Sequence, residues 1–388
     1  GERHDGHDFV EAALEAGACA AVVEASQAGR YAAVLQPKLR PVADTLVALQ
    51  ELAAAARRRW GRPVIAVTGS AGKTTTKEMI AAVLATKYRV LRNQGNLNNH
   101  IGVPLTLLRL SPDYDLAVLE MGMNHAGEIA RLAAIAAPNV GVFTNVGEAH
   151  LGNFRSIDEI AEAKRELARA IPPTGTLILN QDDPRVARFG EGFGGQVIFY
   201  RAPPDPSIQL QYAGRHHQAN AAAALATGQL FDVAPQAGWD ALLRLEPPAG
   251  RGQVIHFRDM VLLHDCYNAN PAAMEAMLEV LQETPGRRHI AVLGEMRELG
   301  AAGVMLHERV GAAAAATGVD TLIGVGSEAS AYLDGARAAG FHGEGKTFPN
   351  AMAAGEFLRT YLVPGDVALF KASRAVKLED AVALITAA

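Results

Sequence analysis

The chain has 388 residues, 49% of them hydrophobic and 20% charged, as in ordinary globular proteins. At roughly 150 residues per domain, this length predicts two or three domains. A net charge of −5 without a basic block argues against nucleic acid as the main partner. Pro, Gly or charge interrupts every apolar run before the roughly 20 residues that a membrane helix needs, so we expect no membrane span.

The two cysteines, Cys19 and Cys266, are far apart and fit no metal-binding spacing, which is typical of a protein of the reducing cytoplasm. The chain opens on the polar stretch "GERHDGHDF", without an initiator Met or a signal peptide. We therefore expect that residues preceding Gly1 are missing and that the first domain is incomplete.

Residues 1–61 contain short helical and strand-like pieces, with helical spacing over 46–60. Gly61-Arg62-Pro63 ends that helix. From Val64, apolar strands alternate with helices; the strands read "VIAVTG", "LAVLEMG", "VGVFTNV" and "TLILN", and a helix is expected over 156–171. This pattern predicts an α/β domain with a mostly parallel sheet over 62–246.

A second boundary lies at Pro247-Pro248-Ala249-Gly250. Beyond it the strands "MVLLHD", "HIAVLGE", "TLIGVG" and "DVALFKAS" again alternate with helices, which predicts a Rossmann-like domain over 247–388. The expected fold class is therefore α/β with three domains. In such sheets, ligands bind at the carboxyl ends of the strands.

The stretch "VTGSAGKTTTKE" resembles a phosphate-binding loop, but it is two residues shorter than the usual P-loop between its first glycine and the Gly-Lys pair. A strand, a Gly-rich turn and a helix starting near Lys73 aim backbone amides at phosphates. That context weakens the alternative of a Gly-rich turn with a chance Lys. We expect Lys73 to reach the terminal phosphates and Thr74 to bind Mg²⁺. The predicted nucleotide-binding loop comprises Gly69, Ser70, Ala71, Gly72, Lys73, Thr74 and Thr75.

Polar residues follow the other predicted strands of this sheet. Glu120 closes "DLAVLE", where nucleotide enzymes place a second Mg²⁺ ligand, although a strand-end Glu can also lie in solvent. His150, in "TNVGEAHLGNF", is a candidate ligand for a further cation or for a phosphate, although a lone His is more often structural. Lys164 lies on the helix expected after Ser156 and by itself reads as a solvated charge.

The last domain carries two further stretches. "HDCYNANP" follows its first strand, and Asp265, Asn268 and Asn270 offer hydrogen bonds to a sugar, a base or a peptide. "KASR", residues 371–374, follows its last strand and is suited to a carboxylate. Arg251 lies at the domain boundary, where a moving domain can bring a cation to a transferring phosphoryl group.

Long stretches of the chain resemble the Mur ligase family of ATP-dependent amide ligases, to which folylpolyglutamate synthase is related. They are "NLNNHIGVPLTLL", "LEMGMNHAGEI", "NVGEAHLGNFRSIDEIAEAKRE", "DCYNANPAAMEAML" and "LGEMRELG". The opening resembles the family's uridine-binding domain. "DCYNANP" favours the member that adds D-Ala-D-Ala to UDP-MurNAc-tripeptide over the member that adds the third residue, which carries a DYAHTP-like stretch there.

This resemblance implies a cytoplasmic, monomeric enzyme of peptidoglycan synthesis that uses ATP and Mg²⁺ and proceeds through an acyl phosphate. It implies that Thr74 and Glu120 hold Mg²⁺ at the β- and γ-phosphates and that His150 binds a second Mg²⁺. Lys164 matches a lysine that is carbamylated in several members, which would place an anion beside that metal. The expected catalytic set is Lys73, Lys164, His150 and Arg251.

The resemblance also assigns Asn220 to adenine, Arg251 to the γ-phosphate and Asp265 to the ribose or nucleotide edge. Asn268, Asn270, Ser373 and Arg374 would lie near the dipeptide. Three features depart from the family pattern: His216-His217 stands in place of His-Asn, "KASR" in place of Lys-Gly-Ser-Arg, and 195–214 is shorter than expected.

Two alternative functions remain open on the sequence. A folylpolyglutamate synthase-like ligase would perform the same chemistry on a folate, but it would lack the uridine-binding domain and "DCYNANP". A P-loop NTPase that couples hydrolysis to motion would need no third domain with an Asn-rich strand end. The third residue of the tripeptide, diaminopimelate or lysine, stays undetermined.

Overall fold

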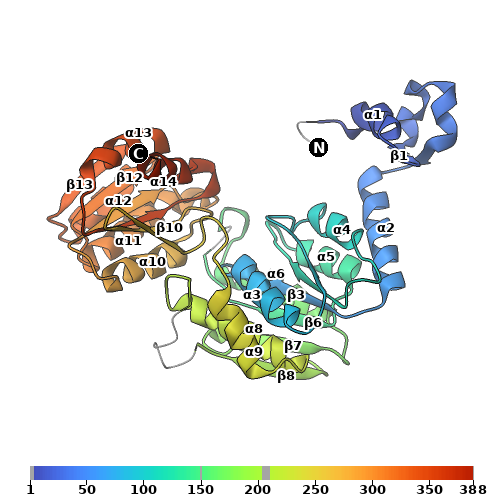
Figure 1. The fold of residues 1–388 in the computed structure, drawn as a ribbon, viewed down its shortest axis with the longest axis horizontal. Coiled ribbons are helices and arrows are strands. Elements are labelled where there is room, and N and C mark those ends of the chain that lie inside the picture. Colours follow the sequence, from blue (N-terminus) through green and yellow to red (C-terminus); the bar gives the residue numbers. More distant parts are fainter. Residues whose placement is uncertain (1–3, 149–150, 203–209, 388) are drawn as a thin grey trace.

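The computed structural model describes residues 4–148, 151–202 and 210–387. Within these ranges the chain forms an α/β fold with one small and two large sheets (Figure 1). The N-terminal part and the part around the last sheet lie on opposite sides of the central part (Figure 1). No helix among the described residues is both long and apolar enough to cross a membrane.

The N-terminal part is built on two parallel strands, β1 (Ala21–Glu24) and β2 (Leu39–Val42), with helix α1 (Val10–Glu15). Its 3₁₀ turns are η1 (Gly6–Phe9), η2 (Ala25–Arg30) and η3 (Ala33–Lys38). Helix α2 (Thr45–Trp60) connects this part to the central one and confirms the helix predicted over 46–60. Asp44 caps its first turn by accepting from the Leu46 and Val47 amides, and Gly61 ends it in the left-handed conformation, with φ 69°.

Helix α2 is fastened to the central part by Arg57, which is buried although it is charged. Its Nε donates to Ala136 O at 2.8 Å and its Nη2 donates to Ala137 O at 3.0 Å. These carbonyls belong to the carboxyl end of helix α5 (Glu128–Ala136), where a cation offsets the unpaired carbonyl dipoles. The guanidinium therefore satisfies a helix terminus and joins two parts of the fold.

The central sheet has the order β4-β5-β3-β6-β7-β8, and every neighbouring pair is parallel. Its strands are β3 (Val64–Thr68), β4 (Val90–Arg92), β5 (Leu116–Glu120), β6 (Val140–Phe143), β7 (Thr176–Asn180) and β8 (Gln196–Tyr200). Its helices and turns are α3 (Lys73–Ala85), α4 (Gly102–Leu107), α5, η4 (Leu151–Asn153), α6 (Ile157–Ala170), α7 (Pro184–Ala187), η5 (Arg188–Gly190), α8 (His216–Leu230) and α9 (Pro235–Arg244). The predicted parallel sheet is confirmed.

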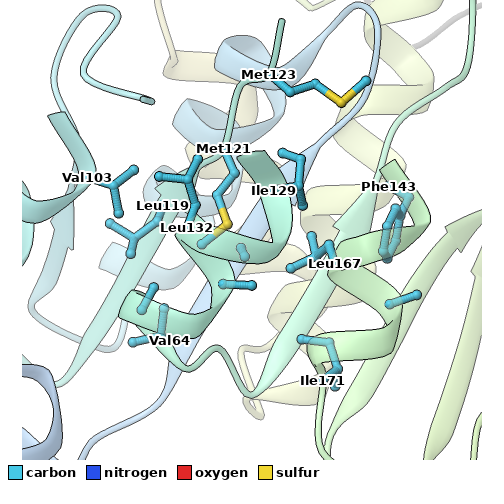
Figure 2. Packing of buried hydrophobic residues seen from close by; sticks show 14 of the residues in the cluster. Val64, Val103, Leu119, Met121, Met123, Ile129, Leu132, Phe143, Leu167 and Ile171 are labelled. Carbon is cyan, nitrogen blue, oxygen red and sulfur yellow. The ribbon is translucent and has the colours of Figure 1, made fainter. Parts of the chain in front are cut away.

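Both faces of the central sheet are covered, which explains why β3 and β5 are continuous apolar runs. Alternate residues point to opposite faces. Val64 and Leu119 pack with Leu132 and Leu167 of α5 and α6 (Figure 2). Ile65 and Val67, which alternate with Val64 along β3, pack on the other face against residues of α3 and α8.

The last sheet has the order β13-β12-β11-β14-β10-β9. Its strands are β9 (Gln253–Phe257), β10 (Met260–Asp265), β11 (Arg288–Gly294), β12 (Thr321–Val325), β13 (Glu344–Phe348) and β14 (Asp366–Lys371). Its helices and turns are α10 (Pro271–Glu283), η6 (Gly300–Ala302), α11 (Gly303–Ala316), α12 (Ser330–Ala338), α13 (Ala351–Tyr361), η7 (Arg374–Val376) and α14 (Glu379–Thr386). The four predicted strands, β10, β11, β12 and β14, are confirmed. The two edge strands of this sheet, β9, which is antiparallel to β10, and β13, were not predicted.

Helices α11 and α12 approach each other closely because each presents a glycine to the backbone of the other. A Cβ built on Gly311 would lie 1.9 Å from Tyr332 O, and one built on Gly335 would lie 1.9 Å from Glu308 O. Such distances allow no side chain without movement of a backbone.

We predict that Gly311→Ala lowers the free energy of unfolding by about 1–3 kcal/mol, because overpacking outweighs the gain of about 1 kcal/mol in helix propensity. Gly29→Ala is the control, since a Cβ there meets nothing within 4 Å. Denaturant unfolding followed by circular dichroism measures both. Equal stability of the two variants would contradict this account of the helix contact.

Candidate active site

A cleft of about 860 Å³ lies where polar loops of the central and last sheets meet. Its wall includes the loop before α3, the carboxyl ends of β5 and β6, and the start of α8. Arg251 and the loops that follow β10 and β14 line it as well. Stretches that are more than two hundred residues apart in sequence therefore face one space.

The short phosphate loop, Gly69 to Gly72, is held in its conformation by hydrogen bonds to Asn145. Asn145 O accepts from the Ser70 amide at 2.9 Å, and Asn145 Oδ1 accepts from the Ala71 amide at 2.8 Å. Gly69 has φ 156°, and a Cβ there would lie 1.8 Å from Thr144 Oγ1. The loop therefore needs glycine because it lies directly against the residues that follow β6.

Helix α3 begins at Lys73, and its first-turn amides face the cleft. The first amide that donates within the helix is that of Thr76, to Gly72 O at 2.8 Å. Gly72 has no side chain with which to cap the amides of Lys73, Thr74 and Thr75. A helix terminus with free amides is suited to phosphate oxygens.

Lys73 folds back over the loop, where its Nζ donates to Gly69 O at 2.8 Å and to Ser70 O at 3.3 Å. Burial lowers the pKa of its ammonium below the usual value. The Glu120 carboxylate raises that pKa, and the Arg251 guanidinium lowers it. An incoming polyphosphate offers this cation stronger acceptors than the two carbonyls.

Thr74 and Glu120 lie in direct contact, since Thr74 Oγ1 donates to Glu120 Oε2 at 2.7 Å. Asn98 Nδ2 donates to Glu120 Oε1 at 2.7 Å, and the Glu120 amide donates to Asn93 Oδ1 at 2.9 Å. A hydroxyl and one oriented carboxylate beside a phosphate loop fit Mg²⁺, which binds through one or two carboxylates plus substrate phosphates. No cluster of three or more His, Cys, Asp or Glu suited to a metal occurs among the described residues.

Of the other two predicted metal-site residues, His150 and Lys164, the structure describes only Lys164. His150 lies outside the described residues. Lys164 is almost completely buried on α6 and is not among the described residues that line the cleft. Burial lowers the pKa of Lys164 well below its usual value, and the charge of Lys73 lowers it further. The neutral amine is thereby favoured.

Asn220 lies against the phosphate loop rather than in open space. Its Oδ1 accepts from Thr76 Oγ1 at 3.1 Å, and its Nδ2 lies 3.3 Å from His217 Nδ1. Burial lowers the pKa of His217 well below its usual value, whereas the neighbouring His216 is exposed. The buried imidazole of His217 therefore forms an uncharged wall beside Asn220.

The Asp265 carboxylate has a protein partner on each oxygen. Lys371 Nζ donates to Oδ2, and the Gly252 amide donates to Oδ1 at 3.1 Å. Lys371 also donates to Asn268 O at 3.1 Å. Asp265 thus joins the loop after β10 both to β14 and to the segment around Arg251.

The remaining predicted residues of the last sheet have structural contacts as well. Asn270 caps α10, since its Oδ1 accepts from the Ala273 amide at 2.9 Å. Ser373 Oγ accepts from the Arg297 amide at 2.9 Å, and Arg374 pairs with Glu379. Of these, Asn270 and Arg374 line the cleft.

Asn93, Asn98 and Asn145 orient Glu120 and the phosphate loop, and the sequence alone did not indicate these roles. The first two lie in or beside the Asn-rich stretch "NQGNLNNH", and Asn145 directly follows Thr144 after β6. Several asparagines between apolar segments could have indicated polar contacts near the site, but only the folded chain shows which partner each side chain binds.

Comparisons with known proteins place these features in a family. The Mur ligase middle domain matches residues 67–205, and the Mur ligase, glutamate ligase domain, matches residues 250–374. UDP-N-acetylmuramoyl-tripeptide--D-alanyl-D-alanine ligase of Synechocystis sp. is 42% identical over 408 aligned residues, covering 100% of this chain and 88% of that protein. The Bacillus subtilis enzyme of the same name is 36% identical, covering 98% and 88%.

Solved structures agree with these relatives. MurF from Acinetobacter baumannii superposes with a TM-score of 0.89 at 33% identity, covering 100% of this chain and 89% of that one. MurF ligase from Thermotoga maritima in complex with ADP has a TM-score of 0.85 at 28% identity, covering 100% and 92%. With this similarity along the whole chain and both domain models matched, the chain belongs to the Mur ligase family.

Proposed function

We propose that this chain joins D-alanyl-D-alanine to UDP-N-acetylmuramoyl-tripeptide at the expense of ATP, forming a peptidoglycan precursor. The observation that carries this proposal is the 42% identity, over the whole chain, to a relative named for that reaction. The cleft supports it, because the phosphate loop and the "DCYNANP" loop line the same space.

The reaction first has to activate a carboxylate, which is a poor electrophile. An oxygen of the tripeptide's terminal carboxylate attacks the γ-phosphorus of ATP, the bond to the β,γ-bridging oxygen breaks, and ADP leaves. Two anions must meet in this step. Lys73, the first-turn amides of α3 and Arg251 supply positive charge where the negative charges converge.

The dipeptide amine then attacks the acyl carbon, loses a proton, and phosphate departs with its bonding electron pair, leaving an amide. We propose that Asn268, Asn270 and Arg374, which line the cleft beside the last sheet, orient the dipeptide, with Ser373 next to Arg374. Exclusion of water protects the acyl phosphate from hydrolysis.

We propose that Thr74 and Glu120 hold Mg²⁺, which when bound neutralises charge on the β- and γ-phosphates. We also propose that the Lys164 amine, favoured in its neutral form by burial, takes up CO₂ to form a carbamate and release a proton. The product is an anion on α6. His150, outside the described residues, stays a predicted ligand of a second Mg²⁺.

The remaining roles follow from the same likeness. We propose that Asn220 and the wall beside it bind the base of ATP, and that Asp265 acts at the nucleotide edge through the loop that it fastens. Because the reaction consumes ATP, we propose the cytoplasm as its location. Because its product is a peptidoglycan precursor, we also propose a role in cell-wall formation and cell division.

We predict that phosphate release requires both UDP-MurNAc-tripeptide and D-Ala-D-Ala and rises at least about tenfold when the dipeptide is added, since the acyl phosphate is otherwise shielded from water. A coupled phosphate assay measures this, with mass spectrometry of the nucleotide product. ATP hydrolysis that is indifferent to both substrates would favour a P-loop NTPase, and a folate-dependent reaction would favour the folate ligase.

We predict that Glu120→Gln raises the Mg²⁺ concentration needed for half-maximal activity by about 10–100-fold, because the carboxylate charge is lost while the shape is kept. Glu279→Gln, on the exposed face of α10, is the matched control. Titration of activity against Mg²⁺ at saturating ATP measures the shift. An unchanged Mg²⁺ requirement would remove Glu120 from the metal site.

We predict that Lys164→Ala lowers kcat by about 10–100-fold and that short carboxylic acids partly restore it, because they replace the carbamate anion. Lys73→Ala is the control, since an added anion cannot replace a cation at the phosphate loop. The assay compares both variants with and without acetate. Full activity of Lys164→Ala, or equal rescue of both variants, would argue against carbamylation.

A further inference from the structure

The segment around Arg251 is held in a defined path between the central and last sheets. Arg251 lies between Gly250 and Gly252, which have φ 70° and φ 66°, a region that favours glycine. The Tyr267 amide donates to Gly250 O at 3.0 Å, and the Gly252 amide donates to Asp265 Oδ1 at 3.1 Å. The loop after β10 therefore fixes the backbone on both sides of this arginine.

The Arg251 side chain lies on the ring of Tyr267. Its guanidinium carbon is 3.9 Å from the ring centroid, a distance typical of a stacked cation–π contact. No carboxylate among the described residues pairs with this guanidinium, so the ring is its main partner. The guanidinium therefore remains available to an anionic ligand.

A second arginine approaches the same ring. Arg374, which follows β14, has its guanidinium carbon 5.7 Å from the Tyr267 centroid and is anchored by Glu379. Both arginines, Tyr267 and Lys73 line the cleft. Besides burial, the Arg251 charge helps to lower the pKa of Lys73, so these two cations lie within electrostatic reach of each other. Such a gathering of positive charge suits a polyanion.

We propose that Tyr267 is a positioning residue whose aromatic face holds the Arg251 guanidinium towards the phosphate site and, through Arg374, links it to the acceptor side of the cleft. This inference rests on the function proposed above. The contact uses the π face, which is negative, so the ring matters and the hydroxyl does not. Because Tyr267 lies in the loop after β10, Arg251 reaches the phosphate site only when the last sheet lies against the central part.

Two substitutions at Tyr267 test the role of the ring. We expect Tyr267→Phe to keep kcat within about twofold and Tyr267→Leu to lower it about tenfold, while KM for ATP changes less than about threefold. Tyr88→Leu is the matched control, because it removes a cation–π contact with Lys87 outside the cleft. Equal losses in Tyr267→Phe and Tyr267→Leu would overturn the proposal.

A double-mutant cycle separates positioning from general damage. If Tyr267 acts through Arg251, Tyr267→Leu lowers kcat less than about threefold further in an Arg251→Ala background. Multiplicative losses would overturn the proposal. Thermal unfolding of each variant shows whether it folds.

Fluorinated phenylalanines at position 267 provide a test that needs no loss of shape. Each added fluorine weakens the negative ring face while the side chain keeps nearly the same size, so log kcat is expected to fall steadily from Phe to trifluoro-Phe. A flat series would overturn the role of the ring. Dipeptide-dependent phosphate release by the unaltered chain is measured in parallel. Its absence would overturn the proposed function as well, whereas its presence with a flat series would overturn only the role of Tyr267.

Discussion

The phosphate loop depends on its contact with Asn145. A loop with only two residues between its glycine and the Gly-Lys pair is too short to enclose a phosphate by itself. The Asn145 carbonyl and side chain bind the amides of Ser70 and Ala71, while Thr144 lies where a side chain on Gly69 would be. The strand that follows in sheet order therefore gives the loop its shape. Loss of that contact would leave the start of α3 without a defined surface for the nucleotide.

The same edge of the central sheet orients Glu120 and Thr74, the proposed metal ligands, and meets the last sheet. Asn98 and Asn93 hold Glu120 in place, and Glu120 in turn contacts Thr74. Near the cleft, the Gly152 amide donates to Glu298 O at 3.0 Å, and Arg309 pairs with Glu148. Arg251 is supported by the last sheet although it lines the same cleft as the phosphate loop. The site is thus complete only when both sheets contribute.

Much of the fold could be predicted because buried parallel strands are continuous apolar runs, and β3, β5, β6 and β7 have that pattern. The antiparallel edge strand β9 escaped prediction, since one side of an edge strand is exposed and its sequence "QVIHF" mixes polar and apolar residues. Asp265 and Asn270 were predicted as ligand contacts. The structure adds that one fastens the segment around Arg251 and the other caps α10, because short polar side chains bind the nearest backbone as readily as a ligand.

The sequence by itself determined the α/β architecture and the family and predicted the nucleotide loop, since these depend on local spacing and on long contiguous matches. Only the tertiary structure decided which polar side chains share the cleft. It also decided that Lys164 is buried where the charge of Lys73 acts on it, and that the Tyr267 ring stacks on the Arg251 guanidinium. The physical reason is that desolvation and stacking depend on neighbours brought together by sheet order. The 15 residues between Arg251 and Tyr267 carry no sign that the ring folds back onto the guanidinium.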